Sequence, residues 1–423
     1  MSGAHAIFTR AMATSTLVVC AMAAPAAAQH VTTVKDIYTG PYSAAPTALI
    51  EMNGVLYFST GQGAGPLWRS DGTDVGTYQV MDFFPPAGPP GETTAEMVRI
   101  GNTLYLTAWT PYEGVEIWRS DGTNQGTALV ADVCPGDCGT ARHLTVAGGA
   151  LYFVEDAGQG KELHRSDGTA AGTGMVLDIN PGVGGSDPDS LISFQGQVFF
   201  VASDGVTRTL WKSDGTAAGT MPLRTGLDVP GDPTFLTIVG QILYFAADAP
   251  FGPRTVWRSD GTPTGTFPLG SVSGPANPDN LAAIRGDLYF TAEDAGFGRE
   301  LFRVDPLDQS FVRVTDIAPG PASSSPMALI DVAGTLYFSA DDGFSGRELW
   351  AVSDGHPGGP VFRVADIYPG PGSSHPEDLF EVGGTLFFTA DGPLGAEMWR
   401  SDGTEAGAQI VHDLQDLAAR LAK

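Results

Sequence analysis

Cysteine is scarce in this 423-residue chain, which has only three. Cys20 lies near the N-terminus, whereas Cys134 and Cys138 stand close together in Cys-Pro-Gly-Asp-Cys. A structural zinc site needs about four ligands, and no second Cys or His pair with metal-ligand spacing is near this motif in the sequence. We therefore expect a small disulfide loop between Cys134 and Cys138 in an oxidising compartment, with a redox-active pair as the alternative.

Positive charge is also scarce, with 22 Lys and Arg residues against 48 Asp and Glu residues and a formal net charge of −26. An acidic field of this size repels nucleic acids and anionic lipid surfaces, so a nucleic-acid partner is not expected. The same charge keeps an exported protein soluble or attracts cations such as calcium, and solubility is the simpler explanation.

Long apolar runs are absent beyond the N-terminus. Arg10 ends a short basic region, residues 11–24 are largely apolar, and Ala26-Ala27-Ala28 forms an A-x-A cleavage site. This pattern predicts a signal peptide over residues 1–28, and Val19 before Cys20 does not fit a lipoprotein box. No later segment is long and apolar enough to span a bilayer. We expect a secreted, periplasmic or cell-envelope protein without a transmembrane segment.

Groupings of catalytic residues are missing from the sequence as well. The seven histidines follow no Ser/His/Asp order and no metal-binding motif, and no carboxylate pair stands out from its surroundings. No catalytic residue is predicted, and no cofactor is expected apart from the calcium considered below.

The sequence does contain one repeated unit, which begins as Leu-Trp-Arg-Ser-Asp-Gly-Thr at Leu67 to Thr73. Its aromatic position recurs every 45 to 50 residues and identifies eight units. This spacing is typical of propeller blades. The position is occupied by Trp68, Trp118, His164, Trp211, Trp257, Phe302, Trp350 and Trp399. These residues could stack on glycans, but a residue repeated in every unit is more often part of the core between units.

Each unit carries four strand signals. The first two form a hairpin around a glycine turn, as in residues 49–58, where Asn53-Gly54 separates two β-rich runs. The third is the Glu-Leu-Trp-Arg segment, and the fourth usually follows Gly-Thr. The pattern predicts an all-β, eight-bladed β-propeller of four-stranded antiparallel blades over residues 29–407. A β-solenoid is the second choice, because solenoid coils are usually shorter and seldom need a hairpin glycine in every unit.

Two kinds of loop carry polar side chains. The connection Asp-Gly-Thr-x-x-Gly-Thr between the third and fourth strands is interpreted as turn chemistry. The loops between the second and third strands are acidic but lack the dense D-x-D-x-D spacing of a calcium site, so calcium is the weaker interpretation. Its candidate ligands are Asp156, Asp294, Asp341, Asp342 and Asp391. In a four-stranded blade these acidic loops lie at the same end as the proline-rich loops between blades, and this end is the expected binding surface.

The Glu-Leu-Trp-Arg-Ser-Asp-Gly-Thr-x-x-Gly-Thr repeat resembles the bacterial ELWxxDGT-repeat proteins over nearly the whole chain that follows the signal peptide. This resemblance implies export and a repeat fold, and it brings no reaction or catalytic residues. The chain departs from the motif at His164, at residues 302–305 and at residues 351–356. The second and third strand patterns also resemble TolB-type propellers, which act through protein contacts.

Fourth-strand patterns occur nine times for eight units. The surplus copy predicts that residues 33–37 pair with the third strand of the last unit and close the ring. The C-terminal tail, residues 408–423, would then be free to form a helix. Ile410, Leu414, Leu417 and Leu421 have helical spacing, which predicts a helix from about Gln409.

Two functions remain open at this point. The first is an exported, noncatalytic propeller, expected as a monomer, that binds a protein or glycan or serves as a scaffold. The second is an exported propeller enzyme, a hydrolase or lyase acting on polysaccharide or peptide. A cluster of non-repeated polar residues would favour the enzyme, and a set of equivalent residues would favour binding.

Overall fold

The computed structural model describes residues 34–35, 37, 46–60, 65–83, 95–136, 139–224, 231–250, 252–270, 274–353, 359–393, 395–404 and 406–412. The predicted signal peptide, residues 1–28, lies outside these ranges. Within them the secondary structure consists of strands and turns, and there is no helix that is long and apolar enough to cross a membrane.

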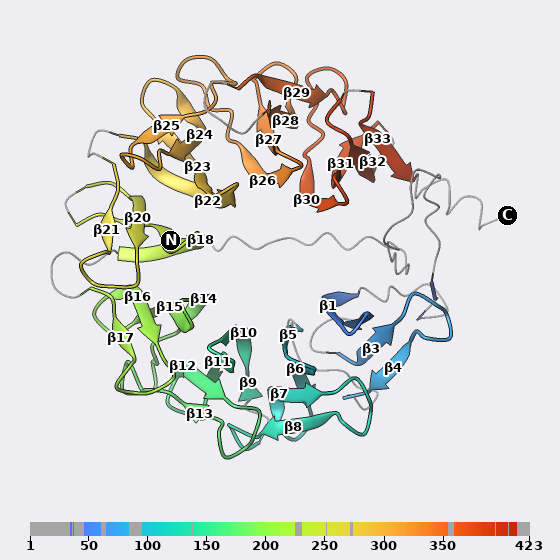
Figure 1. The fold of residues 1–423 in the computed structure, drawn as a ribbon, viewed down its shortest axis with the longest axis vertical. Helices are drawn as coiled ribbons and strands as arrows, with labels where there is room; N and C mark the ends of the chain where they lie inside the picture. The colour runs from blue at the N-terminus through green and yellow to red at the C-terminus, as the bar shows by residue number, and fades with distance from the viewer. Residues whose placement is uncertain are drawn as a thin grey trace. The chain divides into compact units, whose positions relative to one another are not determined.

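The chain forms eight antiparallel blades of four strands each, which confirms the predicted fold class (Figure 1). Blades 1 and 2 contain β1–β4 and β5–β8, and blades 3 to 8 contain the successive groups of four from β10–β13 to β30–β33. In each blade the strands follow one another in sequence order. Blade 2 has one addition, β9 (Gly139–Thr140), which pairs in parallel with the third strand of that blade.

The first two strands of each blade form the predicted hairpin. The first strands are β1 (Thr47–Met52), β5 (Met97–Ile100), β10 (Arg142–Ala147), β14 (Asp189–Phe194), β18 (Gly231–Val239), β22 (Ala276–Ile284), β26 (Met327–Val332) and β30 (Glu377–Val382). The second strands are β2 (Val55–Ser59), β6 (Thr103–Thr110), β11 (Ala150–Asp156), β15 (Gln197–Ser203), β19 (Ile242–Asp248), β23 (Asp287–Asp294), β27 (Thr335–Asp341) and β31 (Thr385–Gly392). The turn of the first hairpin is made by Asn53 and Gly54, whose φ angles of 57° and 77° explain the Asn-Gly pair.

The repeated motif forms the outer half of each blade. The third strands are β3 (Leu67–Ser70), β7 (Gly114–Ser120), β12 (Lys161–Ser166), β16 (Arg208–Ser213), β20 (Thr255–Ser259), β24 (Gly298–Val304), β28 (Arg347–Val352) and β32 (Gly395–Ser401). The fourth strands are β4 (Tyr78–Met81), β8 (Ala128–Ala131), β13 (Gly174–Met175), β17 (Met221–Pro222), β21 (Phe267–Pro268), β25 (Phe311–Arg313), β29 (Val361–Ala365) and β33 (Gln409–His412).

The chain divides into two compact units. Unit 1 contains residues 1–206 and 212–221, and unit 2 contains residues 207–211 and 222–423, so the boundary passes through blade 4. Within each unit the hydrophobic core lies between neighbouring blades. In unit 1, Met52, Tyr57 and Leu67 of blade 1 pack with Leu104 and Leu106 of blade 2. The consecutive Leu-Tyr-Phe residues of the second strands are apolar because both faces of a blade are covered.

The connection between the third and fourth strands is a turn held by side-chain hydrogen bonds, as the sequence indicates. In blade 5, Asp260 Oδ1 accepts hydrogen bonds from the backbone N–H of Thr262 (2.9 Å) and from its hydroxyl (2.6 Å). Hydroxyl oxygens of Ser259 and Thr266 lie 2.7 Å apart in the buried interior of the turn. Blades 1, 2, 3 and 4 repeat these contacts. The hydrogen bonds from Thr262 hold the pKa of Asp260 below its ordinary value.

The two ends of the chain differ from the prediction. Gln409–His412 is the strand β33, which pairs with β32 of blade 8, so the helix predicted from about Gln409 is wrong for these residues. The fourth position of the last blade is thereby taken by C-terminal sequence, not by residues 33–37. The repeated turn before Gln409 and the β-branched Ile410 and Val411 favour a strand over the helical spacing. Residues 413–423 lie outside the described residues.

Lys35, from the predicted closing segment, has a different contact. Its ammonium donates hydrogen bonds to the backbone oxygens of Asp74 (3.1 Å) and Thr77 (2.9 Å) in the turn of blade 1. Arg224, which follows the fourth strand of blade 4, donates to the equivalent oxygens of Pro263 and Thr266 in blade 5. Lys35 therefore contacts the turn of blade 1 in the same way as Arg224, which follows a fourth strand, contacts the turn of the next blade.

Candidate functional site

The repeated aromatic residues lie within the blades. Trp257 is 1% exposed and stacks on Phe245, with ring centroids 6.1 Å apart. Phe58 with Trp68, Phe153 with His164, and Phe290 with Phe302 repeat this stacked pair between second and third strands. Trp211 is buried, and Trp68, Trp118, Trp350 and Trp399 are half-buried. These positions form packing contacts within the blades.

The five calcium candidates are distributed over separate loops. Asp156, Asp294 and Asp341 each accept a hydrogen bond from the backbone N–H of a glycine two residues on, at 2.9, 2.8 and 2.7 Å. Asp342 accepts from Phe344 and Ser345, and Asp391 forms an ion pair with His375 at 3.5 Å. Among the described residues, no three acidic, histidine or cysteine side chains are grouped as metal ligands. Asp156, Asp294, Asp341 and Asp342 are therefore capping residues of tight turns, and Asp391 is an ion-pair partner.

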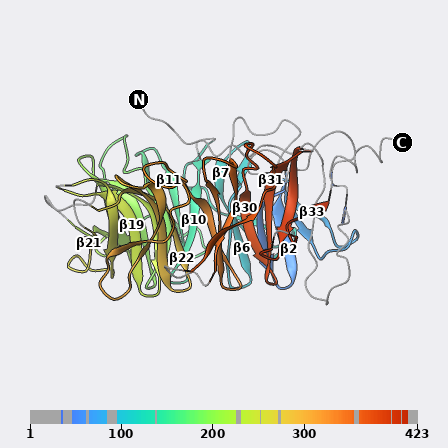
Figure 2. The ribbon, with the colours of Figure 1, turned by 90° about the horizontal axis from the view of Figure 1, so that it is seen from above.

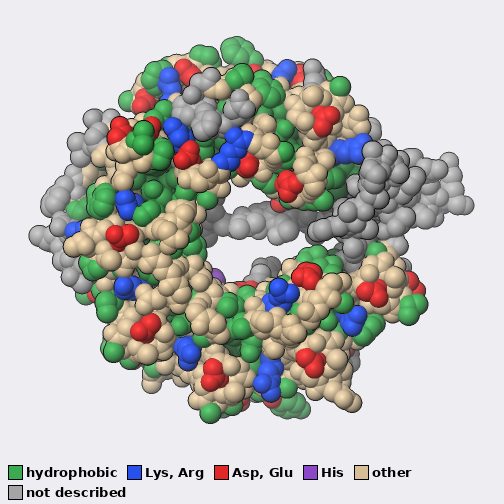
Figure 3. Space-filling view, viewed as in Figure 1, with side chains coloured by type: hydrophobic (Ala, Val, Ile, Leu, Met, Phe, Trp, Pro, Cys, Tyr) green, Lys and Arg blue, Asp and Glu red, His purple; other side chains and the backbone are tan. Residues whose placement is uncertain are grey.

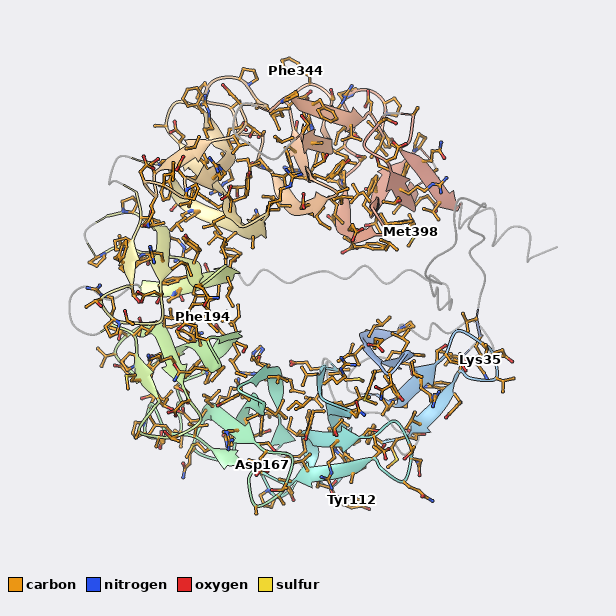
Figure 4. All side chains as sticks on the ribbon, viewed as in Figure 1. Lys35, Tyr112, Asp167, Phe194, Phe344 and Met398 are labelled. Atoms are coloured by element: carbon orange, nitrogen blue, oxygen red, sulfur yellow. The ribbon has the colours of Figure 1, made fainter. Side chains whose placement is uncertain are left out.

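The same loops carry exposed apolar side chains at their tips, a feature that the sequence analysis missed. Each lies between the second and third strands of its blade. In unit 1 they are Tyr112 of blade 2 (80% exposed) and Val206 of blade 4 (88%), and in unit 2 Phe297 of blade 6 (37%) and Phe344 of blade 7 (80%). Figure 4 shows Tyr112 and Phe344 at the outer side of their blades, away from the first strands. A signal was present in the sequence, because an apolar residue directly follows a proline or a glycine in each of these loops.

The acidic residues hold these tips in place. Asp342 Oδ1 accepts hydrogen bonds from the backbone N–H of Phe344 (2.8 Å) and Ser345 (2.7 Å). Burial opposes ionisation of Asp342, but these hydrogen bonds prevail and lower the pKa of its carboxyl group. Asp204 Oδ1 likewise accepts from the N–H of Val206 at 2.9 Å. The tips are thus exposed and at the same time fixed by their own turns.

A cleft of about 660 Å³ adjoins one of these tips in unit 2. Its lining includes Gly274 and Ser323 from loops between blades and Pro253 from the loop between the second and third strands of blade 5. The acidic pair Glu293 and Asp294 completes it. Glu293 accepts hydrogen bonds from Asn277 (2.9 Å) and Arg299 (2.9 Å), and these lower its pKa. The cleft lies at the end of the blade where the acidic and proline-rich loops meet, and its charged wall suits a cationic or hydroxyl-rich group.

A second, shallower depression of about 590 Å³ lies along the first strands of unit 1. Ile50, Met97, Leu144 and Leu191 line it, one from each of the four blades. An ion pair between Glu51 and Arg99 at 3.4 Å closes one side. Elsewhere on the visible faces, acidic and basic side chains are interspersed within each unit (Figure 3).

Buried glutamates at the start of the third strands form a repeated structural feature that sequence reasoning also missed. Glu348 Oε2 accepts hydrogen bonds from the backbone N–H of Ile367 (2.9 Å) and the hydroxyl of Ser374 (2.7 Å), so it anchors the loop that leads to the next blade. The members of this set, all 0% exposed, are Glu116, Glu162, Glu300, Glu348 and Glu397. The signal was the Glu of Glu-Leu-Trp-Arg, which recurs with an Asp in the fourth-strand pattern.

One junction departs from this arrangement, because Glu155 of β11 brings a second buried carboxyl group toward Glu116. Both side chains are 0% exposed. Burial raises the pKa of Glu116 to about 8, with the charge of Glu155 as the next cause. Burial likewise raises the pKa of Glu155 to about 7, against hydrogen bonds from Thr140.

Of the predicted disulfide pair, Cys134 follows β8 in the described part of the chain, and Cys138 lies outside it. The backbone N–H of Cys134 donates to Glu116 Oε1 at 3.1 Å, so the predicted loop begins against the buried glutamate. The bridge itself stays a prediction, as does the resemblance to the ELWxxDGT-repeat proteins.

Fold and loops together define an all-β repeat protein whose blades present fixed, partly apolar loop tips. No model of a known protein family matches the chain. A search of curated proteins finds no match either. Among solved structures it is similar to the computationally designed Ika8 protein (TM-score 0.46, 14% identity, 85% of this chain and 96% of that one covered).

Figure 2 shows the blades of the chain from the side. Two natural proteins are also similar to the chain. A puromycin-hydrolyzing peptidase of Mycobacterium tuberculosis matches with TM-score 0.42 and 12% identity over 82% of this chain and 57% of that one. TolB from Acinetobacter baumannii matches with TM-score 0.34 and 12% identity over 73% and 77%. The chain thus spans little more than half of the peptidase, and these distant likenesses assign no function.

Proposed function

We propose that this chain is an exported, noncatalytic binding protein that recognises a protein partner through the tips of the loops between second and third strands. The observation that supports this proposal is the exposure of an apolar side chain at equivalent places, Tyr112, Val206, Phe297 and Phe344. Exposed apolar residues that recur at one position, bordered by carboxylates, are typical of an interaction surface.

Preorganisation strengthens this interpretation. The turn of Phe344 is closed by three hydrogen bonds to Asp342, from two backbone N–H groups and from the hydroxyl of Ser345 (3.1 Å). At Tyr112, the hydroxyl of Thr110 and the carboxylate of Glu113 close the turn. A side chain that is held in its bound position before association loses less conformational entropy on binding, so it contributes more to affinity.

Export is part of the same proposal. The signal-peptide pattern of residues 1–28 and the acidic composition support a secreted or periplasmic location. Catalysis is the alternative that the sequence left open. The two carboxyl groups with strongly raised pKa values, Glu116 and Glu155, are fully buried, and a polysaccharide or peptide has no access to them.

The chain offers a matched test of the binding surface. Tyr112→Ser and Phe344→Ser remove one tip in each unit, and Val75→Ser and Leu307→Ser remove equally exposed apolar residues (88% and 94%) from the turns at the opposite end of their blades. The mature protein and the four variants would be immobilised and compared for binding to periplasmic and secreted proteins and to a glycan array. We expect the two tip variants to weaken binding of a defined protein about tenfold or more, and the two controls to bind normally.

Two results would contradict the proposal. If Val75→Ser and Leu307→Ser weaken binding as much as the tip variants, the surface is not at the loop tips. If the glycan array alone gives binding that depends on the tips, the partner class is wrong and the protein is a glycan-binding one.

A further inference from the structure

The first strands of most blades contain a bulge at the same place. Among the described first strands, seven have a non-glycine residue with a φ angle between 50° and 59°, directly followed by a leucine. The register with the second strand skips both residues. Positive φ is unfavourable for such residues, and bulges often lie beside functional sites. The residues with positive φ are Ala48, His143, Ser190, Phe235, Asn280, Ala328 and Asp378.

In blade 3 this bulge binds a carboxylate. The backbone N–H of His143 donates to Oε1 of Glu96 at 2.9 Å, and the N–H of Leu144 donates to Oε2 at 2.7 Å. Glu96 directly precedes β5 of blade 2, so both N–H groups point from β10 toward the neighbouring blade. Blade 6 shows half of the same contact, since the N–H of Asn280 donates to Oδ1 of Asp279 at 2.7 Å. Successive N–H groups that converge in this way form an anion-binding nest.

The equivalent nest of blade 4 consists of Ser190 and Leu191. Ser190 has a φ angle of 52°, close to the 59° of His143, and the ladder between β14 and β15 skips both residues. Within the unbroken described range 139–224, no side chain accepts a hydrogen bond from either N–H group. The backbone that holds Glu96 in blade 3 is therefore present in blade 4 without a carboxylate from these residues.

The sequence explains why the nest of blade 4 is open. Glu96 and His143 occupy equivalent places, five residues before the hairpin glycines Gly101 and Gly148. The hydroxyl of Thr145 lies 3.4 Å from the carbonyl oxygen of Leu191, so the first strands of blades 3 and 4 are neighbours at this point. A histidine thus precedes the nest of blade 4 where a glutamate precedes the nest of blade 3.

The open nest borders the apolar depression of unit 1. Leu144 and Leu191, the second residues of the two nests, both line this depression of about 590 Å³. Ile50 and Met97 continue its apolar lining into blades 1 and 2. A ligand that fits both features carries a carboxylate and, within a few bonds of it, apolar groups.

The charged side chains around the open nest balance one another. Arg142 and Lys161 lie 3.1 and 3.8 Å from the carboxylate of Asp187, and Asp189 adds a second acid directly before Ser190. Affinity for a carboxylate would therefore come from two directed hydrogen bonds and not from net positive charge.

We propose that the nest of Ser190 and Leu191 binds the C-terminal carboxylate of a peptide whose last side chains are apolar and lie in the depression. The carboxylate takes the place in blade 4 that the carboxylate of Glu96 takes in blade 3. At a chain terminus the carboxylate is bonded to the Cα atom that carries the last side chain, so one residue meets both requirements. This site lies along the first strands, away from the loop tips, and it does not depend on the function proposed above.

The test uses the mature protein and a fluorescein-labelled peptide that ends in Leu-Val-Leu with a free carboxylate. The same peptide with a C-terminal amide is the control ligand. We expect the acid to bind about tenfold more tightly than the amide in fluorescence anisotropy, because a charged acceptor forms stronger hydrogen bonds with the two N–H groups.

Two matched variants examine the place of binding. His143→Glu supplies a carboxylate beside the open nest and should weaken binding of the acid about tenfold. Phe235→Glu puts the same charge at the equivalent bulge of blade 5, which also has positive φ and does not line the depression, and should leave binding unchanged. Equal affinity of the two variants for the acid would overturn the proposal.

Nuclear magnetic resonance of the unmutated protein gives a measurement that does not depend on how a variant folds. The amide protons of Ser190 and Leu191 should move downfield when the acid is added, as expected for N–H groups that gain an acceptor. Those of His143 and Leu144 already donate to Glu96 and should move much less. Equal binding of acid and amide, or binding of neither, would refute the proposal. If sodium laurate moves these protons and the peptide acid does not, the ligand is a fatty acid and the assignment to a peptide is wrong.

Discussion

The hydroxyl of Ser374 lies 2.7 Å from Oε2 of Glu348, and both residues are fully buried. Ser374 belongs to the loop that enters blade 8, and Glu348 is the second residue of β28, the third strand of blade 7. The carboxylate of Glu348 accepts hydrogen bonds from the hydroxyl of Ser374 and from the backbone N–H of Ile367. It thus links the end of blade 7 to the loop that enters blade 8. Repetition of this contact explains why Glu precedes Leu-Trp-Arg in several units.

Replacement of this carboxylate should destabilise the fold strongly. Glu348→Ala leaves the N–H of Ile367 and the hydroxyl of Ser374 without an acceptor in a closed interior, and we expect a loss of about 3 kcal/mol in the free energy of unfolding. Glu348→Gln keeps one acceptor oxygen and should cost about 1 kcal/mol. Urea unfolding at neutral pH measures both. Glu381→Ala, at an exposed position in blade 8, is the control and should change stability by less than about 0.5 kcal/mol.

The repeated aromatic position should contribute through packing. Trp257→Ala removes a side chain that is 1% exposed and stacked on Phe245, and its indole N–H donates to the backbone oxygen of Ala247 at 3.3 Å. We expect a loss of about 3–5 kcal/mol, measured by denaturant unfolding. Phe344→Ala removes an aromatic ring that is 80% exposed and should change stability by less than about 0.5 kcal/mol. Equal losses in the two variants would show that the repeated aromatic residue is not a core residue.

The Cys134–Cys138 bridge should form in the exported protein. Mass spectrometry of protein recovered from an oxidising compartment should show both cysteines resistant to alkylation until a reductant is added. A loop this short gains little from closure, so Cys134→Ser with Cys138→Ser should cost about 2 kcal/mol or less. Two freely alkylated thiols would refute the bridge.

Most of the fold could be predicted from the sequence because each repeat contains residue patterns that are typical of β-strands and hairpin turns. The runs Leu-Tyr-Phe and Leu-Trp-Arg give the paired second and third strands, and Asn53-Gly54 gives the hairpin turn. Glu348 and its counterparts were missed as anchors because a single-letter pattern does not show that a charged residue points into a junction. Tyr112 and Phe344 were missed for the opposite reason, since apolar residues in the sequence suggest a core, and only the structure shows them exposed.

The C-terminal end shows where local periodicity misleads. Ile410 belongs to a helical spacing in sequence, yet it pairs with Trp399 as part of β33. The third strand of blade 8 has an unpaired edge unless a fourth strand covers it, and this tertiary requirement prevails over the helical pattern. The segment around Lys35 could not be placed from sequence either, because its contact with Asp74 and Thr77 depends on backbone oxygens, which any residue supplies.

Two truncations should separate the roles of the C-terminal residues. A chain that ends at Ala408 lacks β33, so Met398, Trp399 and Arg400 lose their backbone partners and the edge of β32 is exposed. We expect the free energy of unfolding to fall by about 2–3 kcal/mol and the protein to associate through the open edge. A chain that ends at His412 keeps the whole ladder and should fall by less than about 0.5 kcal/mol. Thermal unfolding together with light scattering measures both effects. Equal stability of the two truncated chains would mean that β33 does not complete blade 8, and that another segment covers the third strand.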